Sequence, residues 1–398
     1  MNFFTQHKSI LALCVGLLCC VLAFFIFPKV FRSHYILGIP NKSLASVDTA
    51  VKPTPAPVES FTPSYVQTPT QVKGLYITSW TASTPSLRNN LVNLIDTTEL
   101  NTVVIDVKDY TGKIVFPVSD PVLRAYGSEE VRVKDMRDFV ETLHKKGIYV
   151  IARIAVFQDA YFVKYRPDLA VKNKAGTAVW KDRKGISWID PGSQEYWDYI
   201  VLLAQQTRNI GFDEINFDYI RFPSDGNMQD ISYPYSSTTP KTQVMKSFFS
   251  YLHDKLISQR TVSGDGVKIS ADLFGMVTTA QDDMGIGQLL ENALPYFDYI
   301  MPMVYPSHYP PTFQGYKNPE AYPYEVVKFA MQSGVNRAKV ASTTPLKLRP
   351  WLQDFGLKQT YGSAEVRAQI KATYDVGLDS WILWSASNKY TRGALDSQ

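Results

Sequence analysis

Short apolar runs alternate with helix-like segments through most of the chain, from Lys73 to the C-terminus. About eight strand–helix units fit this alternation, and eight is the number that a closed parallel barrel requires. Runs such as 102–107 are apolar at nearly every position, which is typical of strands covered on both faces. The sequence therefore predicts an α/β protein with a (β/α)8 TIM barrel. A doubly wound sheet is the alternative, but it would normally be shorter and carry a glycine-rich phosphate-binding turn, which this sequence lacks.

The predicted elements follow from apolar periodicity and from glycine or proline at the boundaries. The fourth strand is the most informative, because Asn216 and Asp218 should share one face while Phe217 and Tyr219 take the other. Strands are expected at 74–80, 102–107, 148–154, 215–220, 267–275, 298–306, 339–343 and 379–385. Helices are expected at 86–94, 135–146, 194–208, 241–260, 287–293, 324–334 and 364–376.

The N-terminus carries a separate apolar segment. Residues 10–27 contain no charged side chain and are long enough to cross a membrane or to act as a signal sequence. The following segment 25–28, Phe-Ile-Phe-Pro, is a poor cleavage site, so we expect an uncleaved single-pass anchor with the rest of the chain outside the cytoplasm. Lys29 and Arg32 on the far flank oppose the positive-inside pattern for that orientation.

Prolines scattered among Ser, Thr and Val between this segment and the first strand indicate an extended tether, which would hold the folded domain away from the bilayer. The predicted organisation is a short tail at 1–9, a transmembrane anchor at 10–27, a Pro/Ser/Thr-rich linker at 28–71 and the barrel domain at 72–398.

The composition narrows the chemistry that the chain can perform. The three cysteines, Cys14, Cys19 and Cys20, all lie in the apolar segment, so the rest of the chain has neither a disulfide nor a thiolate metal site. Of the five histidines, only His308 is expected in a cleft, and it lacks partners at metal-ligand spacing. The net charge of +4 is spread along the chain and gives no nucleic-acid footprint. We expect no metal and no other cofactor.

Carboxylates stand at the predicted ends of several strands, where barrel enzymes place their reactive residues. Asp218 and Asp272 end consecutive strands, so both should face one pocket. Glycosidic bond cleavage needs such a pair, with one carboxyl as nucleophile or base and the other as acid. We assign Asp218 as the nucleophile, paired with the charge of Arg221, and Asp272 as the proton donor, with Asp106 as its rival. The structural alternatives are an Asp–Arg ion pair at a strand end and a packing role for Asp272 with Ser270.

Further residues at the strand ends are predicted to bind substrate. Aromatic residues make up 13% of the chain, which is more than a core requires. A flat ring can stack on a sugar face while its polar tip stays hydrated, although each such ring could equally be a core residue at the barrel rim. The predicted substrate-binding residues are Trp80, Asp106, Asp109, Arg153, Asn216, Arg221, Tyr305 and Trp384.

Five motifs carry a resemblance to a known family. They are KGLY at 73–76, VIDVKD at 104–109, FDEINFDYIRFP at 212–223, SADLFG at 270–275 and MPMVYP at 301–306. These motifs resemble a bacterial family of glycoside hydrolase domains, a barrel group distantly similar to the alpha-amylase and alpha-galactosidase superfamilies. The resemblance runs from Val72 to the C-terminus, and the motif at 212–223 is its most specific part.

The resemblance implies roles for two carboxylates. In those superfamilies an aspartate that ends the fourth strand is the nucleophile, and Asp218 matches it. The amylase-like acid on the fifth strand is a glutamate, whereas the nearest match here is Asp272, whose side chain is shorter. The resemblance also implies a retaining mechanism.

The sequence thus predicts a membrane-anchored glycoside hydrolase that cleaves a cell-envelope or extracellular polysaccharide. The alternative is a non-catalytic carbohydrate-binding barrel on the cell surface, which would keep the aromatic residues and tolerate loss of one carboxylate. The histidines give little support to a metal-dependent deacetylase or hydrolase. An acyl-transfer triad would require a Gly-x-Ser-x-Gly turn, which the sequence lacks. The expected partners are a polysaccharide or oligosaccharide and the membrane, with no nucleic acid.

Overall fold

The computed structural model describes residues 61–257 and 267–398. The predicted tail at 1–9, the predicted anchor at 10–27 and most of the predicted linker at 28–71 lie outside these residues, as do the three cysteines. In the described part of the chain, no helix has both the length and the apolar character of a membrane span.

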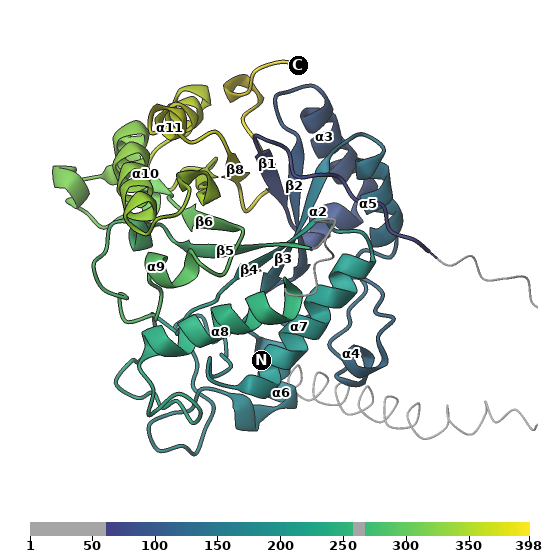
Figure 1. The fold of residues 1–398 in the computed structure, drawn as a ribbon, viewed down its shortest axis with the longest axis vertical. Coiled ribbons are helices and arrows are strands. Elements are labelled where there is room, and N and C mark those ends of the chain that lie inside the picture. Colours follow the sequence, from purple (N-terminus) through teal and green to yellow (C-terminus); the bar gives the residue numbers. More distant parts are fainter. Residues whose placement is uncertain (1–60, 258–266) are drawn as a thin grey trace, which may run out of the picture. The chain divides into compact units, whose positions relative to one another are not determined.

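Eight parallel strands form a closed barrel, in which each strand pairs with the next along the chain and the last pairs with the first (Figure 1). The predicted α/β barrel is therefore confirmed, and the doubly wound alternative is wrong. The strands are β1 (Lys73–Ile77), β2 (Thr102–Lys108), β3 (Tyr149–Ala155), β4 (Glu214–Asp218), β5 (Lys268–Phe274), β6 (Tyr299–Met303), β7 (Trp351–Gln353) and β8 (Trp381–Trp384).

Helices surround the strands (Figure 1). Each packs by an apolar stripe, as in α5 (Met136–His144), where Met136, Phe139, Val140 and Leu143 recur at helical spacing and are buried. The other long helices are α3 (Pro85–Asp96), α7 (Gln194–Asn209), α8 (Lys241–Leu256), α10 (Pro323–Val340) and α11 (Ser363–Asp375). The shorter ones are α2 (Ser79–Ser83), α4 (Pro121–Ala125), α6 (Ala160–Tyr165) and α9 (Leu290–Ala293).

The hydrophobic core has two parts. The larger part lies between the strands and the helices and takes Ile215 and Phe217 from β4. The smaller part fills the barrel interior and includes Trp351. Because alternate side chains of a strand point to opposite faces, β4 sends Asn216 and Asp218 into the interior. This burial on both faces explains why the strands read as nearly continuous apolar runs.

The seventh strand is not where the sequence predicted it. Residues 339–343 are the end of α10 and the turn after it, in which Ser342 has a positive φ of 56°. β7 follows Pro350 instead and is only three residues long. The Val and Thr side chains of 339–343 favour a strand locally, but packing of the helix through Val335 and Ala338 overrides that preference.

Residues 61–71, predicted as the end of the linker, belong to the compact unit. The Val66 N–H donates to Asp213 Oδ1 at 2.7 Å, and the Thr68 hydroxyl donates to the Tyr149 hydroxyl at 3.1 Å. Because Asp213 precedes β4 and Tyr149 begins β3, this segment lies at the N-terminal end of the barrel. Residues 61–71 therefore pack with the barrel that was predicted to begin at 72.

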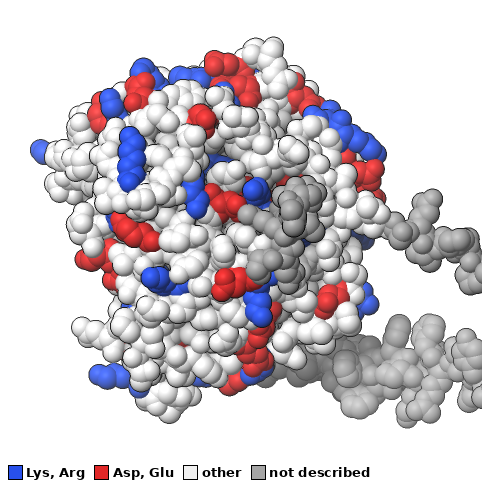
Figure 2. All heavy atoms as spheres, in the orientation of Figure 1, with Lys and Arg blue, Asp and Glu red and all other residues white. Residues whose placement is uncertain are grey.

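Acidic and basic side chains are interspersed over the face drawn in Figure 2, with broad uncharged areas between them. This distribution agrees with the small net charge of +4.

Candidate active site

A cavity of about 520 Å³ lies at the C-terminal ends of the strands, where barrel enzymes hold their active sites. Asp218 and Asp272 both line it, together with Arg153 and Trp384. A second hollow of about 550 Å³ lies near the N-terminal end of β6, and its lining includes one carboxylate, Asp298. Only the first cavity therefore offers the pair of acids that the sequence predicted.

The strand register brings the two acids to the same level. β4 and β5 pair at Phe217 and Ala271, and Asp218 and Asp272 are the next residues of the two strands. Since neighbouring positions across a parallel pair face the same side, both carboxylates point toward the barrel axis. The structure thus brings together the two side chains that the sequence predicted to converge.

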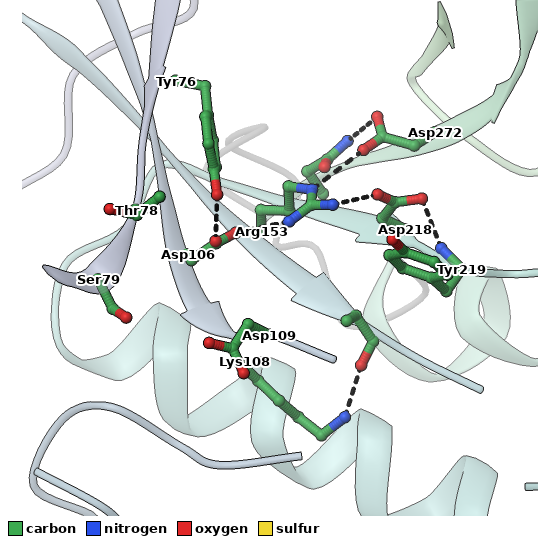
Figure 3. Close-up of polar contacts among 12 residues, drawn as sticks. Tyr76, Thr78, Ser79, Asp106, Lys108, Asp109, Arg153, Asp218, Tyr219 and Asp272 are labelled. Carbon is green, nitrogen blue, oxygen red and sulfur yellow. Dashed lines mark hydrogen bonds and ion pairs between the residues drawn. The ribbon is translucent and has the colours of Figure 1, made fainter. Parts of the chain in front are cut away.

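Arg153 of β3 lies between three carboxylates (Figure 3). Its guanidinium donates to Asp106 Oδ1 at 2.6 Å and to Asp218 Oδ2, and its Nε lies 3.6 Å from Asp272 Oδ2. All four residues are buried, so the attraction is little screened by water. One guanidinium therefore holds Asp218 and Asp272 at a fixed separation.

Asp218 pairs with Arg153 and not with Arg221, so the predicted pairing with Arg221 is wrong. Arg153 is in register with Asn216 on the neighbouring strand, from where its long side chain reaches the next inward position of β4. Arg221 lies beyond the strand end, and its guanidinium packs over the ring of Trp188 with 4.7 Å to the centroid. Proximity in the sequence predicted Arg221 as the partner of Asp218. The pairing of β3 with β4 in the closed barrel supplies Arg153 instead.

Tyr219 adopts a left-handed conformation, with φ of 53°. This turn brings the residue to the cavity, although simple alternation along β4 predicted the opposite face. Its N–H donates to Asp218 Oδ1 at 2.6 Å, so the same turn orients the carboxylate. Such backbone strain costs on the order of 1–3 kcal/mol and is concentrated at functional sites.

Asp272 is buried, and one of its two carboxyl oxygens accepts hydrogen bonds from neighbouring side chains. Its Oδ1 accepts hydrogen bonds from the Trp351 indole N–H at 2.7 Å and the Asn216 amide at 2.9 Å. Burial raises the pKa of Asp272 well above its ordinary value, the charge of Asp218 raises it further, and Arg153 opposes both. A raised pKa is the direction that a proton donor requires.

Asp106, the alternative candidate for the proton donor, binds Arg153. It accepts hydrogen bonds from Arg153 and from the Tyr76 hydroxyl (Figure 3). Burial raises its pKa, and Arg153 lowers it. Asp106 is not among the residues that line the cavity, so its position suits the orientation of Arg153 rather than contact with a ligand.

Two predicted substrate-binding residues, Trp80 and Asp109, lie outside the cavity lining. Thr78 caps α2, which ends the first strand earlier than predicted and places Trp80 in a helix, where it is 62% exposed. Both residues contact Arg132, which pairs with Asp109 at 2.8 Å and lies 4.6 Å from the centroid of the Trp80 ring. They form a separate cluster at the rim.

Tyr305 and Trp384 do line the cavity. Trp384 stacks on Tyr76 with ring centroids 4.0 Å apart, and Tyr305 lies 6.4 Å from Trp384. These rings place apolar faces beside the carboxylates, which suits a sugar ring. Asn216 instead lies below the cavity and holds Asp272.

The described residues include no group of three or more His, Cys, Asp or Glu side chains that could hold a metal ion. A guanidinium, rather than an open space, lies among the three acids. The absence of a cofactor stays a prediction.

Residues 74–390 match a protein-family model described as "Putative glycosyl hydrolase domain". The chain belongs to this glycosyl hydrolase domain family. The match covers the barrel from β1 to beyond β8, and it includes both carboxylates of the cavity. No curated protein matches the chain.

Several solved structures are similar to this glycosyl hydrolase domain. The PgaB (BpsB) glycoside hydrolase domain from Bordetella bronchiseptica is 12% identical with a TM-score of 0.56, over 80% of this chain and 95% of that one. The glycoside hydrolase domain of PelA from Pseudomonas aeruginosa is 12% identical with a TM-score of 0.45, over 81% and 97%. A hypothetical protein from Ruminiclostridium thermocellum is 31% identical with a TM-score of 0.44, over 50% and 97%.

Several residues that line the cavity of this glycosyl hydrolase domain were not predicted from the sequence, among them Tyr219, Phe274 and Trp351. Trp351 was missed because its strand is too short to show alternation. Phe274 and Tyr219 were missed because the prediction for these two strand ends considered only the acids, Asp272 and Asp218. The sequence does contain a signal for them, because a large aromatic residue lies next to each of these predicted strand ends.

The hydrogen bond from Trp351 gives a test of the role of Asp272 in this glycosyl hydrolase domain. Trp351→Phe removes a donor that stabilises the charged carboxylate, so the pKa of Asp272 should rise further. Loss of the acid's proton should then occur at higher pH, moving the alkaline limb of kcat/KM upward by up to about one pH unit. Trp384→Phe, which alters the cavity without a bond to Asp272, is the matched control and should leave that limb in place. A limb that stays fixed or moves down in Trp351→Phe contradicts the assignment.

Proposed function

We propose that this glycosyl hydrolase domain cleaves a cell-envelope or extracellular polysaccharide with retention of configuration at the anomeric carbon. The observation that carries the proposal is that Asp218 and Asp272 line one cavity and contact one guanidinium. This shared contact keeps the two carboxyl groups closer together than roughly 9.5 Å, the upper limit for catalytic carboxyl pairs. Their surroundings also differ as the chemistry requires, because Asp218 is paired with a cation and Asp272 has a raised pKa.

The reaction has two steps. First, the Asp218 carboxylate attacks the anomeric carbon, the glycosidic C–O bond breaks, and Asp272 gives its proton to the departing oxygen. Then the ionised Asp272 takes a proton from water, whose oxygen attacks the same carbon and releases Asp218. Arg153 and the Tyr219 N–H hold Asp218 in position throughout, and Trp384 offers a face on which a sugar ring can stack.

Product analysis tests this proposal directly. The full chain, kept in detergent, is incubated with a panel of envelope and extracellular polysaccharides, and new reducing ends are measured. We expect release from at least one polymer, with the first product carrying the original anomeric configuration in proton NMR spectra. Inverted products contradict the double displacement. Binding of a polysaccharide without release from any of them favours the alternative of a non-catalytic carbohydrate-binding barrel.

We also propose that residues 10–27 anchor the enzyme in a membrane with the barrel outside the cytoplasm. The support is the charge-free apolar segment, followed by a proline-rich stretch. Protease added to intact cells should remove a C-terminal tag, while a cytoplasmic marker protein stays intact. A tag that is cut only after lysis contradicts the orientation.

A further inference from the structure

Arg221 borders the cavity without an acidic partner. It is 8% exposed and lines the same cavity as Asp218 and Asp272. Within the described residues, its hydrogen bonds run only from Nη1, to the Phe222 carbonyl at 2.9 Å and to Ser224 Oγ at 3.2 Å. Its Nε and Nη2 therefore have no protein acceptor in that part of the chain, and no carboxylate there lies within ion-pair distance.

Aromatic rings, rather than acids, hold this guanidinium. Arg221 lies 4.7 Å from the centroid of the Trp188 ring and 4.6 Å from that of Phe274. Cation–π contacts favour the position, and the carboxylates of Asp218, Asp225 and Asp182 act on Arg221 only from beyond ion-pair distance, so burial of this cation without a closer counter-ion is still costly. Asp182 does not fill that role, because its Oδ2 accepts hydrogen bonds from the Trp188 indole at 3.0 Å and the Gln158 amide at 3.1 Å. An unmatched cation at a cavity wall points to an anionic ligand.

A second cation reaches the cavity from the segment between α6 and α7. Lys184 lines the cavity and lies in the turn between the bridge partners Lys181 and Ser187. Lys181, Arg183 and Lys184 are all exposed, and none of the three forms an ion pair with another described residue. This loop thus adds positive charge to the wall that already holds Arg221.

We propose that the cavity recognises an acidic glycan, in which a sugar carboxylate binds Arg221 and Lys184 while the bond to be cleaved lies at Asp218 and Asp272. This inference rests on the proposed function and names its substrate class. The free Nε and Nη2 edge of the guanidinium is a planar fork that matches the two oxygens of a carboxylate, and the lysine adds a point charge. A neutral sugar would leave the buried Arg221 unpaired, which selects against it.

A binding experiment with matched ligands tests the inference. Asp272→Asn in the full chain blocks turnover and keeps the cations, so binding can be measured by the change in tryptophan fluorescence. The probes are oligosaccharides of galacturonate and of glucuronate, each beside the same oligosaccharide after chemical reduction of its carboxyl groups to alcohols. We expect at least one acidic form to bind about tenfold or more tightly than its reduced form, and high salt to diminish the difference.

Variants separate recognition by Arg221 from general charge attraction. Arg221→Met in the same background should abolish the preference, and Arg221→Lys should restore only part of it because the fork is missing. Lys184→Gln, at an exposed position where the fold is not at stake, should weaken the preference several-fold. Arg166→Met, at a partly exposed arginine that pairs with Asp168 and Glu195, is the control and should keep it.

The inference is overturned if no acidic form is preferred, if Arg221→Met and Lys184→Gln both keep the preference, or if sulfated oligosaccharides bind better than the carboxylated ones. Its failure differs from failure of the proposed function. Hydrolysis of neutral polysaccharides alone would overturn the acidic substrate and leave the hydrolase standing. A preference for acidic ligands without hydrolysis would overturn the hydrolase and leave the recognition of acidic glycans standing.

Discussion

Replacing Asp218 by asparagine should lower kcat by about three orders of magnitude or more, on the order of 4 kcal/mol in activation free energy. Asparagine keeps the shape of the side chain but carries no negative charge, so it cannot form the bond to the anomeric carbon that the first step needs. The fold should survive, because the amide oxygen can keep one of the two hydrogen bonds, from the Tyr219 N–H or from Arg153, and Arg153 still pairs with Asp106. The measurement is the initial rate of reducing-end release at saturating substrate, on whichever polysaccharide the panel identifies.

Asp109→Asn is the matched control for this variant. Like Asp218, Asp109 is an aspartate at the C-terminal end of a strand and pairs with an arginine, but it lies outside the cavity lining. Its replacement should leave kcat within about twofold of the wild type, because a partly exposed ion pair contributes little. Equal losses in the two variants would show that general damage, rather than a missing nucleophile, explains the effect. An Asp218→Asn enzyme with normal turnover would remove the residue from the mechanism.

Replacing Arg153 by methionine should lower the free energy of unfolding by about 3–5 kcal/mol at neutral pH. The guanidinium is buried and contacts three acids, so its removal leaves negative charge in the barrel interior without a partner. Urea denaturation followed by tryptophan fluorescence measures the loss. Arg166→Met, which breaks exposed ion pairs, should cost no more than about 1 kcal/mol.

The pH dependence of the Arg153→Met deficit follows from the two acids whose pKa is already raised. Arg153 opposes the effect of burial at both Asp106 and Asp272, so its loss should raise both pKa values further. An acid with a pKa that is higher in the folded than in the unfolded state stabilises the fold at low pH and loses that contribution as pH rises. The deficit should therefore be smaller at pH 5 than at pH 7. A deficit that does not change with pH would indicate lost packing rather than unpaired charge.

The sequence was most informative where structure is local and repetitive. Strand-like runs separated by helical periodicity predicted the barrel, and acids near the C-terminal ends of the fourth and fifth strands predicted that Asp218 and Asp272 meet. Both predictions depend only on the two-residue period of a strand and on the parallel order of strands. β7 could not be predicted in this way, because three residues are too few to show any period.

Pairs of side chains on different strands could not be predicted from the sequence, for a different reason. The sequence placed Arg153 and Asp106 at strand ends, but it did not predict that Arg153 would replace Arg221 as the partner of Asp218. That pairing depends on the offset between β3 and β4, which is set by closure of the whole barrel. The position of Trp80 outside the cavity likewise depends on Thr78, which caps α2 and so ends the first strand before Trp80.

The shortness of β7 has a mechanical consequence. Among the paired positions of the barrel strands, β6 and β7 share a single one, Met303 with Trp351. Trp351 is also the residue whose indole holds Asp272. Separation of β6 from β7 at this pair would move the indole away from Asp272, and loss of that hydrogen bond would raise the pKa of the Asp272 carboxyl.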